Sequence, residues 1–165
     1  MRRDATEDAA QDRTRTSKRI LAISSAGGHW VQLMRLWPVF REHDVVYATS
    51  DAGYAVYLPP GAQLFTFREA TRWNKIGLAR LLLRIAWIVV RVRPNVVVTT
   101  GAAPGYFALR IGKIFRAHTV WIDSLANIEQ MSMSGRLAGG CADLWLTQWP
   151  SVARGGGPFY RGSVL

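Results

Sequence analysis

The sequence predicts an α/β fold, a doubly wound parallel sheet of the Rossmann type. Apolar β-branched runs alternate with amphipathic segments in at least five units along the chain. The run NVVVTT at 95–100 is typical of a strand buried on both faces of a parallel sheet. Two of the runs end in turns of small residues that open helices. A chain of 165 residues, 49% of them hydrophobic and 19% charged, suits one such domain with a sizeable core.

The elements follow from local patterns of apolar and turn-forming residues. Strands are expected at 19–24, 45–49, 64–67, 95–100, 118–123 and 143–148. Helices are expected at 29–40, 72–93, within 101–115 and at 131–142. Pro38 should bend or end the first helix and Pro94 should end the second. The loop 50–62 has room for one turn of helix around Tyr54.

The domain organisation follows from composition. Residues 1–18 lack apolar periodicity and are rich in Asp, Thr and Arg, which predicts a disordered polar tail, either solvated or bound to an anionic surface. The folded domain is expected at 19–149. Residues 150–165 are rich in Gly and Pro and are interpreted as a C-terminal extension.

The formal net charge of +10 favours an anionic partner: a lipid headgroup, a phosphate-bearing substrate, nucleic acid or an acidic protein.

Cys141 is the single cysteine, so an internal disulfide is excluded and a reducing compartment is the default. Its apolar surroundings favour a buried small hydrophobe over a nucleophile. The N-terminus does not have the pattern of a secretory signal, and apolar runs are shorter than a transmembrane helix requires.

The two turns of small residues are the strongest functional signal. They read SSAGGH at 24–29 and TTGAAPGY at 99–106, and both follow a predicted strand and precede a helix. Strands one and four of such a sheet normally lie side by side, so both turns should offer N–H donors to one anion, such as a diphosphate. Alternatively, each glycine merely permits a tight turn. The candidate binding residues are Ser25, Gly27, Gly28, His29, Gly101, Gly105 and Tyr106.

Two side chains could add chemistry at this edge of the sheet. His29 lies in the first turn of its helix, where the positive end of the dipole favours a neutral imidazole that can accept a proton or bind a substrate oxygen. A structural histidine is the alternative. Asp123 ends a strand at the same edge and either reaches the ligand or caps the following segment. His43 and His118 lack partners at metal-ligand spacing, so no metal site is expected.

The helix at 72–93 carries arginine and tryptophan residues on one stripe at helical spacing, composed of Trp73, Arg80, Arg84, Trp87 and Arg91. Arginine and tryptophan together suit the headgroup level of a bilayer. A plain solvated basic face is the alternative.

Two common ligand classes fit poorly. The first turn departs from the G-x-G-x-x-G pattern of nicotinamide sites, and Asp51 alone is a weak ribose-binding signal. The aromatic residues lie mostly in apolar runs, and the sequence contains no recognised nucleic-acid-binding module. Neither a nicotinamide cofactor nor a nucleic-acid partner is therefore expected.

Five motifs in order resemble one family: SSAGGHWVQLMRL, RWNK, VVVTTGAAPGYFALRIGK, WIDSLANIEQMSMSGRLAG and ADLWLTQW. They are similar to the acceptor-side subunit of two-component glycosyltransferases. That group includes bacterial exopolysaccharide proteins of the glucuronosyltransferase type and the membrane-recruiting subunit of the eukaryotic dolichol-linked GlcNAc-transferase. The likeness covers 19–149. More distantly, the two turns resemble those of the N-terminal half of the peptidoglycan GlcNAc-transferase that makes lipid II, a GT-B enzyme.

The resemblance implies one acceptor-binding half of a GT-B enzyme, inactive without a separate donor-binding partner and using no cofactor. Gly27, Gly28 and His29 would contact the acceptor diphosphate or sugar, and Gly101, Gly105 and Tyr106 would form a second wall. The acceptor would be a polyprenyl-diphosphate-linked saccharide, the donor a UDP-sugar, and the product an exopolysaccharide precursor.

The resemblance also implies a place in the cell, the cytoplasmic face of the plasma membrane. The eukaryotic members carry an N-terminal transmembrane helix, whereas residues 1–19 are polar here. Membrane attachment would then depend on the stripe at 72–93 or on the partner. The rival hypotheses are a self-sufficient nucleotide-sugar-binding enzyme and a non-catalytic basic scaffold.

Overall fold

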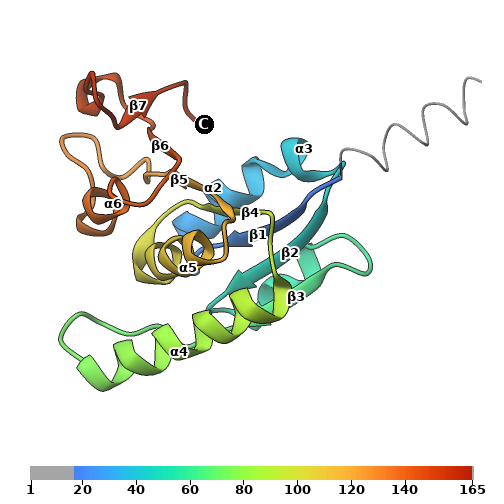
Figure 1. The fold of residues 1–165 in the computed structure, drawn as a ribbon. Coiled ribbons are helices and arrows are strands. Elements are labelled where there is room, and N and C mark those ends of the chain that lie inside the picture. The colour runs from blue at the N-terminus through green and yellow to red at the C-terminus, as the bar shows by residue number, and fades with distance from the viewer. Residues whose placement is uncertain (1–16, 165) are drawn as a thin grey trace, which may run out of the picture.

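The computed structural model describes residues 17–164 as a seven-stranded sheet in which every pair is parallel (Figure 1). The strand order is β3-β2-β1-β4-β5-β6-β7, so the chain winds outward from β1 in both directions. The strands are β1 (Arg19–Ile23), β2 (Asp44–Thr49), β3 (Gln63–Thr66), β4 (Val96–Thr99), β5 (His118–Ile122), β6 (Leu144–Thr147) and β7 (Phe159–Tyr160). The predicted fold class is confirmed. The expected polar tail lies outside the described residues, except for its last two positions.

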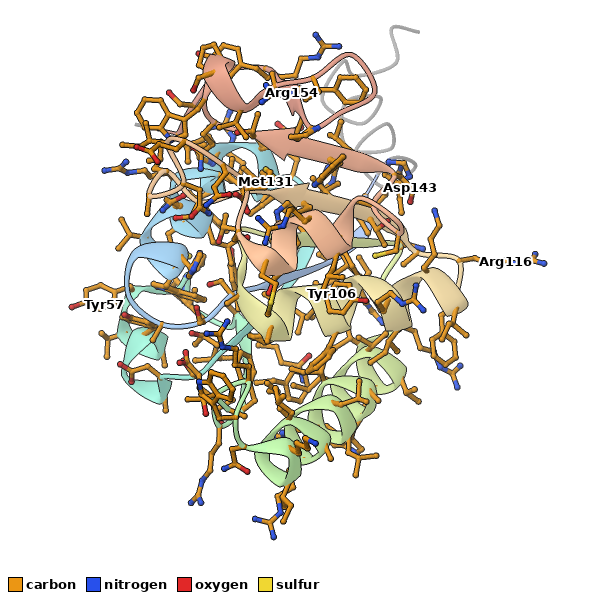
Figure 2. The ribbon with its side chains drawn as sticks, turned by 90° about the vertical axis from the view of Figure 1, so that its left-hand side faces the viewer. Tyr57, Tyr106, Arg116, Met131, Asp143 and Arg154 are labelled. Atoms are coloured by element: carbon orange, nitrogen blue, oxygen red, sulfur yellow. The ribbon has the colours of Figure 1, made fainter. Side chains whose placement is uncertain are left out.

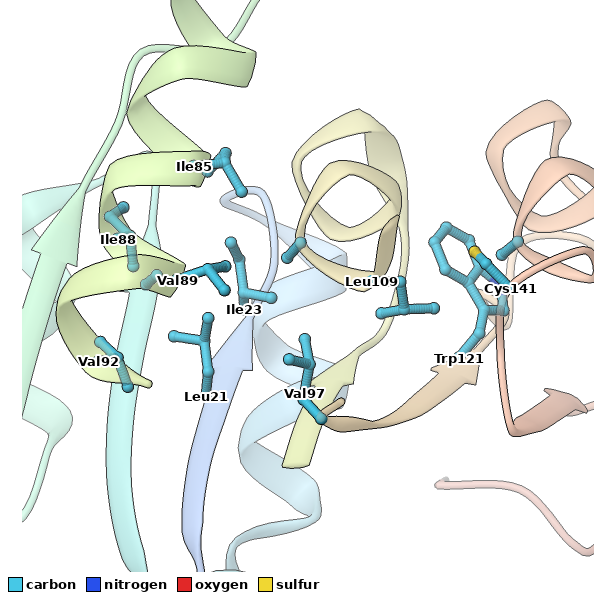
Figure 3. Packing of buried hydrophobic residues seen from close by; sticks show 14 of the residues in the cluster. Leu21, Ile23, Ile85, Ile88, Val89, Val92, Val97, Leu109, Trp121 and Cys141 are labelled. Carbon is cyan, nitrogen blue, oxygen red and sulfur yellow. The ribbon is translucent and has the colours of Figure 1, made fainter. Parts of the chain in front are cut away.

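Helices cover both faces of the sheet (Figure 1). They are α2 (Gly28–Arg35), α3 (Trp37–Phe40), α4 (Lys75–Val92), α5 (Ala102–Ile114) and α6 (Met133–Ala138), with 3-10 turns η1 (Ala52–Tyr57) and η2 (Pro150–Val152). Side chains of α4, α5 and α6 share a buried cluster with Leu21, Val97 and Trp121 (Figure 3). The opposite cluster joins α2 and α3 to alternate positions of the same strands, such as Ala22 and Tyr47. This alternation explains why the central strands are apolar on both faces.

The local expectations hold with four refinements, one of which is that the last helix spans only Met133–Ala138 of the expected 131–142. The first expected helix is divided at Leu36 into α2 and α3, as Pro38 suggested. The second begins at Lys75 because the side chain of Asn74 caps it, accepting from the N–H of Gly77 at 2.8 Å. Strand β7 is not predicted by the sequence, because its two residues gain their conformation only by pairing with the exposed edge of β6.

Three further observations concern the cysteine, the possible metal ligands and the lengths of the helices. Cys141 is buried, and burial raises the pKa of its thiol, as expected of a small core residue rather than a nucleophile. Within residues 17–164, clusters of His, Cys, Asp and Glu large enough to hold a metal ion are absent. In the same part of the chain, each helix is too short or too polar to cross a bilayer.

Candidate functional site

The two glycine turns lie side by side at the carboxyl edge of the sheet. Strands β1 and β4 pair in parallel with Ile23 opposite Thr99, so the turns that follow them are neighbours. His29 joins them: its Nδ1 lies 2.8 Å from the carbonyl oxygen of Thr100, and the Thr100 hydroxyl donates to the carbonyl oxygen of His29 at 2.6 Å. The predicted pairing of the turns is therefore present, and a histidine holds it together.

The contact with Thr100 defines the tautomer of a neutral His29 ring. A backbone carbonyl only accepts hydrogen bonds, so Nδ1 must carry the proton that bonds it. The other ring nitrogen, Nε2, is then an acceptor. His29 is half-buried, held by the protein on one side of its ring. This arrangement suits a proton acceptor for a substrate hydroxyl.

The glycines of the turns serve different purposes. A Cβ at Gly101, where φ is +134°, would lie 2.6 Å from Cε1 of His29, and one at Gly105 would lie 2.1 Å from Oγ1 of Thr99. Both are needed for close packing. Gly27 has φ +75°, which an L side chain rarely adopts. Gly28 has neither constraint, since a Cβ there would meet open space. The fold therefore requires glycine at positions 27, 101 and 105. It does not require glycine at position 28, where the missing side chain lets a ligand approach the backbone closely.

Part of the first turn is already hydrogen-bonded by residues that the sequence analysis missed. The N–H of Ala26 donates to Oγ of Ser50 at 2.9 Å and to Oε1 of Glu69 at 3.3 Å, and the N–H of Gly27 donates to Oη of Tyr54 at 2.9 Å. These partners come from the segments after β2 and β3, too far away in sequence for a local pattern to reveal them. The following N–H groups, in the first turn of α2, have no acceptor within the helix and therefore remain available to a ligand.

Ser25 and Tyr106 are less exposed to a ligand than expected. Ser25 is the second residue after β1 and is 7% exposed. Tyr106, labelled in Figure 2, lies on α5, half-buried against the larger core cluster, with its ring 5.9 Å from that of Phe107. Tyr106 thus supports the helix that carries the second turn.

Asp123 has the contacts of the capping alternative. It is 1% exposed and its carboxylate accepts hydrogen bonds from the indole N–H of Trp121, the side-chain amide of Asn127, and both the N–H and the hydroxyl of Ser132. Four donors satisfy the buried charge without a basic partner. Asp123 therefore organises the loop between β5 and α6.

A buried glutamine pair connects the helix of His29 to that loop. Oε1 of Gln32, one turn after His29, accepts from the N–H of Leu125 at 3.0 Å and from Nε2 of Gln148 at 2.8 Å. Gln148 also donates to the carbonyl oxygen of Asp123 at 2.8 Å. These contacts hold α2 against the loop after β5, so they help to position His29. No sequence motif distinguishes these glutamines from ordinary polar residues.

The predicted stripe on α4 divides into two groups. Arg80, Trp87 and Arg91 are exposed, whereas Arg84 is half-buried and donates through Nε to the carbonyl oxygen of Thr66 at 2.9 Å. Trp73 is exposed but precedes the helix. Four exposed apolar residues share one face of α4 with Arg80. We call this face the outward stripe of α4; it consists of Ile76, Arg80, Leu83, Trp87 and Val90. Ile76 is 67% exposed and Leu83 is 70% exposed.

Known proteins resemble this chain in sequence. A relative from Eremothecium gossypii, named UDP-N-acetylglucosamine transferase subunit ALG14, is 26% identical over 83% of this chain and 75% of its own length. The protein of the same name from Mus musculus is 24% identical over 84% of this chain and 78% of its own length.

Solved structures resemble it in fold. The crystal structure of MurG from Acinetobacter baumannii matches 87% of this chain with a TM-score of 0.66 at 9% identity. The chain spans about half of that protein, 47% of its length. Together with the strand order, this likeness supports the predicted Rossmann-like fold.

The family comparison is more specific than the fold. The model of the family described as oligosaccharide biosynthesis protein Alg14 like matches residues 74–158, which is more than half of the chain. The matched segment contains α4, the second glycine turn and the loop organised by Asp123. This chain belongs to the Alg14-like family.

Proposed function

We propose that this protein is the acceptor-binding and membrane-recruiting subunit of a heteromeric glycosyltransferase. A separate partner binds the UDP-sugar, and the acceptor is a polyprenyl-diphosphate-linked saccharide used in exopolysaccharide synthesis. The names of the two relatives, each a transferase subunit, support the division into two chains. The observation that carries the proposal is the pair of glycine turns joined by His29.

The chemistry requires a proton acceptor and a surface for the acceptor. The acceptor hydroxyl attacks the anomeric carbon of the donor, a new C–O bond forms, and the bond to UDP breaks. Nε2 of His29 takes the hydroxyl proton, because Thr100 holds Nδ1 in its protonated form. Gly28 lets the saccharide approach the backbone closely, since no side chain stands there. UDP leaves with the partner that bound it.

Membrane contact is assigned to the outward stripe of α4, on the cytoplasmic face of the plasma membrane. Four exposed apolar side chains share one helical face with Arg80, and Arg91 lies beside them. Apolar and aromatic side chains enter the interfacial region while arginines pair with anionic headgroups. The formal net charge of +10 also favours binding to an anionic membrane surface.

Substituting Gly28→Asp is expected to abolish measurable sugar transfer by the two-subunit complex while leaving the chain folded. The carboxylate would occupy the approach surface and repel an anionic acceptor, yet meets open space in the fold. The assay is transfer of radiolabelled sugar to a prenyl-diphosphate acceptor, with circular dichroism for folding. Gly155→Asp is the matched control, because a Cβ there also meets open space far from the turns in sequence. Full activity of Gly28→Asp would favour the scaffold hypothesis.

Substituting Ile76→Asn together with Leu83→Asn is expected to reduce sedimentation with vesicles containing phosphatidylglycerol severalfold. Full burial of an aliphatic side chain is worth about 1.5–3 kcal/mol, and shallow insertion into the bilayer interface provides only a fraction of this, which corresponds to a severalfold effect. Val56→Asn is the control, since Val56 is 79% exposed on η1 and lies away from α4 in sequence. Equal vesicle binding by the unmodified chain, the double variant and the Val56→Asn control would show that α4 does not contact the membrane.

A further inference from the structure

A basic cavity lies next to the first glycine turn. It has a volume of about 560 Å³ and is formed by the ends of β2 and β3, the segment 67–74 and the first half of α4. This volume is within the range of small-molecule sites, roughly 300–1,000 Å³. Its charged lining residues are Arg68, Arg80 and Arg84 with one carboxylate, Glu69. We call it the arginine cavity.

The charges of the arginine cavity are arranged for an anion away from the turn. Glu69 is directed to the turn, where Oε1 accepts from the Ser50 hydroxyl at 2.6 Å and the Ala26 N–H at 3.3 Å. Arg84 is held at the wall by its Nε bond to Thr66 and by the Trp87 ring, whose centroid lies 4.6 Å from the guanidinium carbon. A planar, pre-oriented guanidinium is well suited to bind phosphate oxygens.

The same contacts make the beginning of the first turn, at Ala26 and Gly27, a poor place for a diphosphate. The N–H groups of Ala26 and Gly27 already donate to protein oxygens, and the Glu69 carboxylate beside them repels a second anion. The arginines across the cavity attract it. An anion that enters this region therefore has its most favourable position against the arginines.

We propose that the arginine cavity binds the diphosphate of the prenyl-linked acceptor, which leaves Gly28 and His29 to its saccharide. This assignment rests on the proposed function and names the part of the site that takes the charge. Arg80 belongs both to the cavity lining and to the outward stripe of α4, so the two surfaces are continuous. The prenyl chain would thus lie in the bilayer beside the outward stripe, the diphosphate in the arginine cavity, and the saccharide at the first glycine turn.

The test measures binding to the full chain by isothermal titration calorimetry, with farnesyl diphosphate as the water-soluble probe. The double substitution Arg68→Gln and Arg80→Gln should weaken binding by about tenfold or more, because charge-assisted bonds to phosphate are lost. Arg91→Gln is the control, since it removes one positive charge from α4, the helix of Arg80, at a position outside the cavity. Unchanged binding in the double variant, or equal weakening in the control, would overturn the proposal.

Two further probes distinguish the source of the anion. Inorganic pyrophosphate should bind more weakly than farnesyl diphosphate; equal binding would point to a free diphosphate and overturn the acceptor assignment. Phosphatidylglycerol vesicles should bind the double variant and the Arg91→Gln protein about equally well. A selective loss in the double variant, with farnesyl diphosphate binding intact, would make the cavity a headgroup site and likewise overturn the assignment.

Diphosphate binding and sugar transfer can fail independently of each other. Binding of farnesyl diphosphate is read on this chain alone, without sugar transfer. If the two-subunit complex transfers no sugar while binding still depends on Arg68 and Arg80, the proposed function fails and the diphosphate site remains. If transfer occurs and the double variant binds and reacts normally, the proposed function stands and the arginine cavity is excluded.

Discussion

Replacing His29 with Gln is expected to lower sugar transfer by the two-subunit complex about 10²- to 10⁴-fold, the usual contribution of a general base. Gln has a polar side chain of similar length, but its amide is too weak a base to take the proton of the acceptor hydroxyl, as Nε2 of His29 does. The measurement is the initial rate at saturating donor and acceptor. Binding of farnesyl diphosphate to the same variant should stay within about twofold of the unmodified chain, which would assign the loss to chemistry.

His118→Gln is the matched control for that experiment. His118 is exposed at the start of β5, at the opposite edge of the sheet from the turns, and its Nδ1 lies 3.5 Å from Asp143. The substitution should leave the transfer rate within about twofold. A His29→Gln complex as fast as the control would place the catalytic base on the partner subunit and leave His29 with the structural task of joining the turns.

Substituting Gly101→Ala is expected to destabilise the chain by about 2 kcal/mol or more. The new methyl group would lie 2.6 Å from the His29 ring, at a backbone φ of +134° that L residues rarely adopt. Urea unfolding followed by tryptophan fluorescence measures the loss. Gly28→Ala is the control and should change the free energy of unfolding by less than about 1 kcal/mol, because its Cβ meets open space.

A double variant separates the two causes of that loss. In a His29→Ala background the ring is absent, so only the backbone strain of Gly101→Ala should remain. The interaction free energy between the two substitutions is then expected at about 0.5–3 kcal/mol. Equal destabilisation in both backgrounds would contradict the packing of the His29 ring against the second turn.

Most of the fold could be predicted because local patterns and the sheet agree. The valines at 96–98 suit a strand that is buried on both faces, because helices cover both faces of β4. The small residues after the strand mark the start of α5. Strand β7 could not be predicted, because Phe159 and Tyr160 carry no strand pattern of their own and depend on the edge of β6. Pro38 predicted a bend or an end in the first helix, and the division lies two residues earlier, at Leu36.

The site was predictable in outline and not in detail. Adjacent strands β1 and β4 place both turns together, which the usual order of such sheets implies. The partners of the first turn, Ser50, Tyr54 and Glu69, come from loops whose positions depend on the whole domain. Asp123 had two possible roles in sequence, and only its four hydrogen-bond donors favour the structural one.

The sequence by itself determined the alternation of strands and helices, the two glycine turns, the histidine between them and the basic helix at 72–93. These features are encoded by residues close together in the chain, where periodicity and turn chemistry act. The tertiary structure decided which N–H groups remain for a ligand, why Gly101 and Gly105 must lack side chains, and how Arg68, Arg80 and Arg84 meet in one cavity. Each of these depends on contacts between segments far apart in sequence, which no local pattern records.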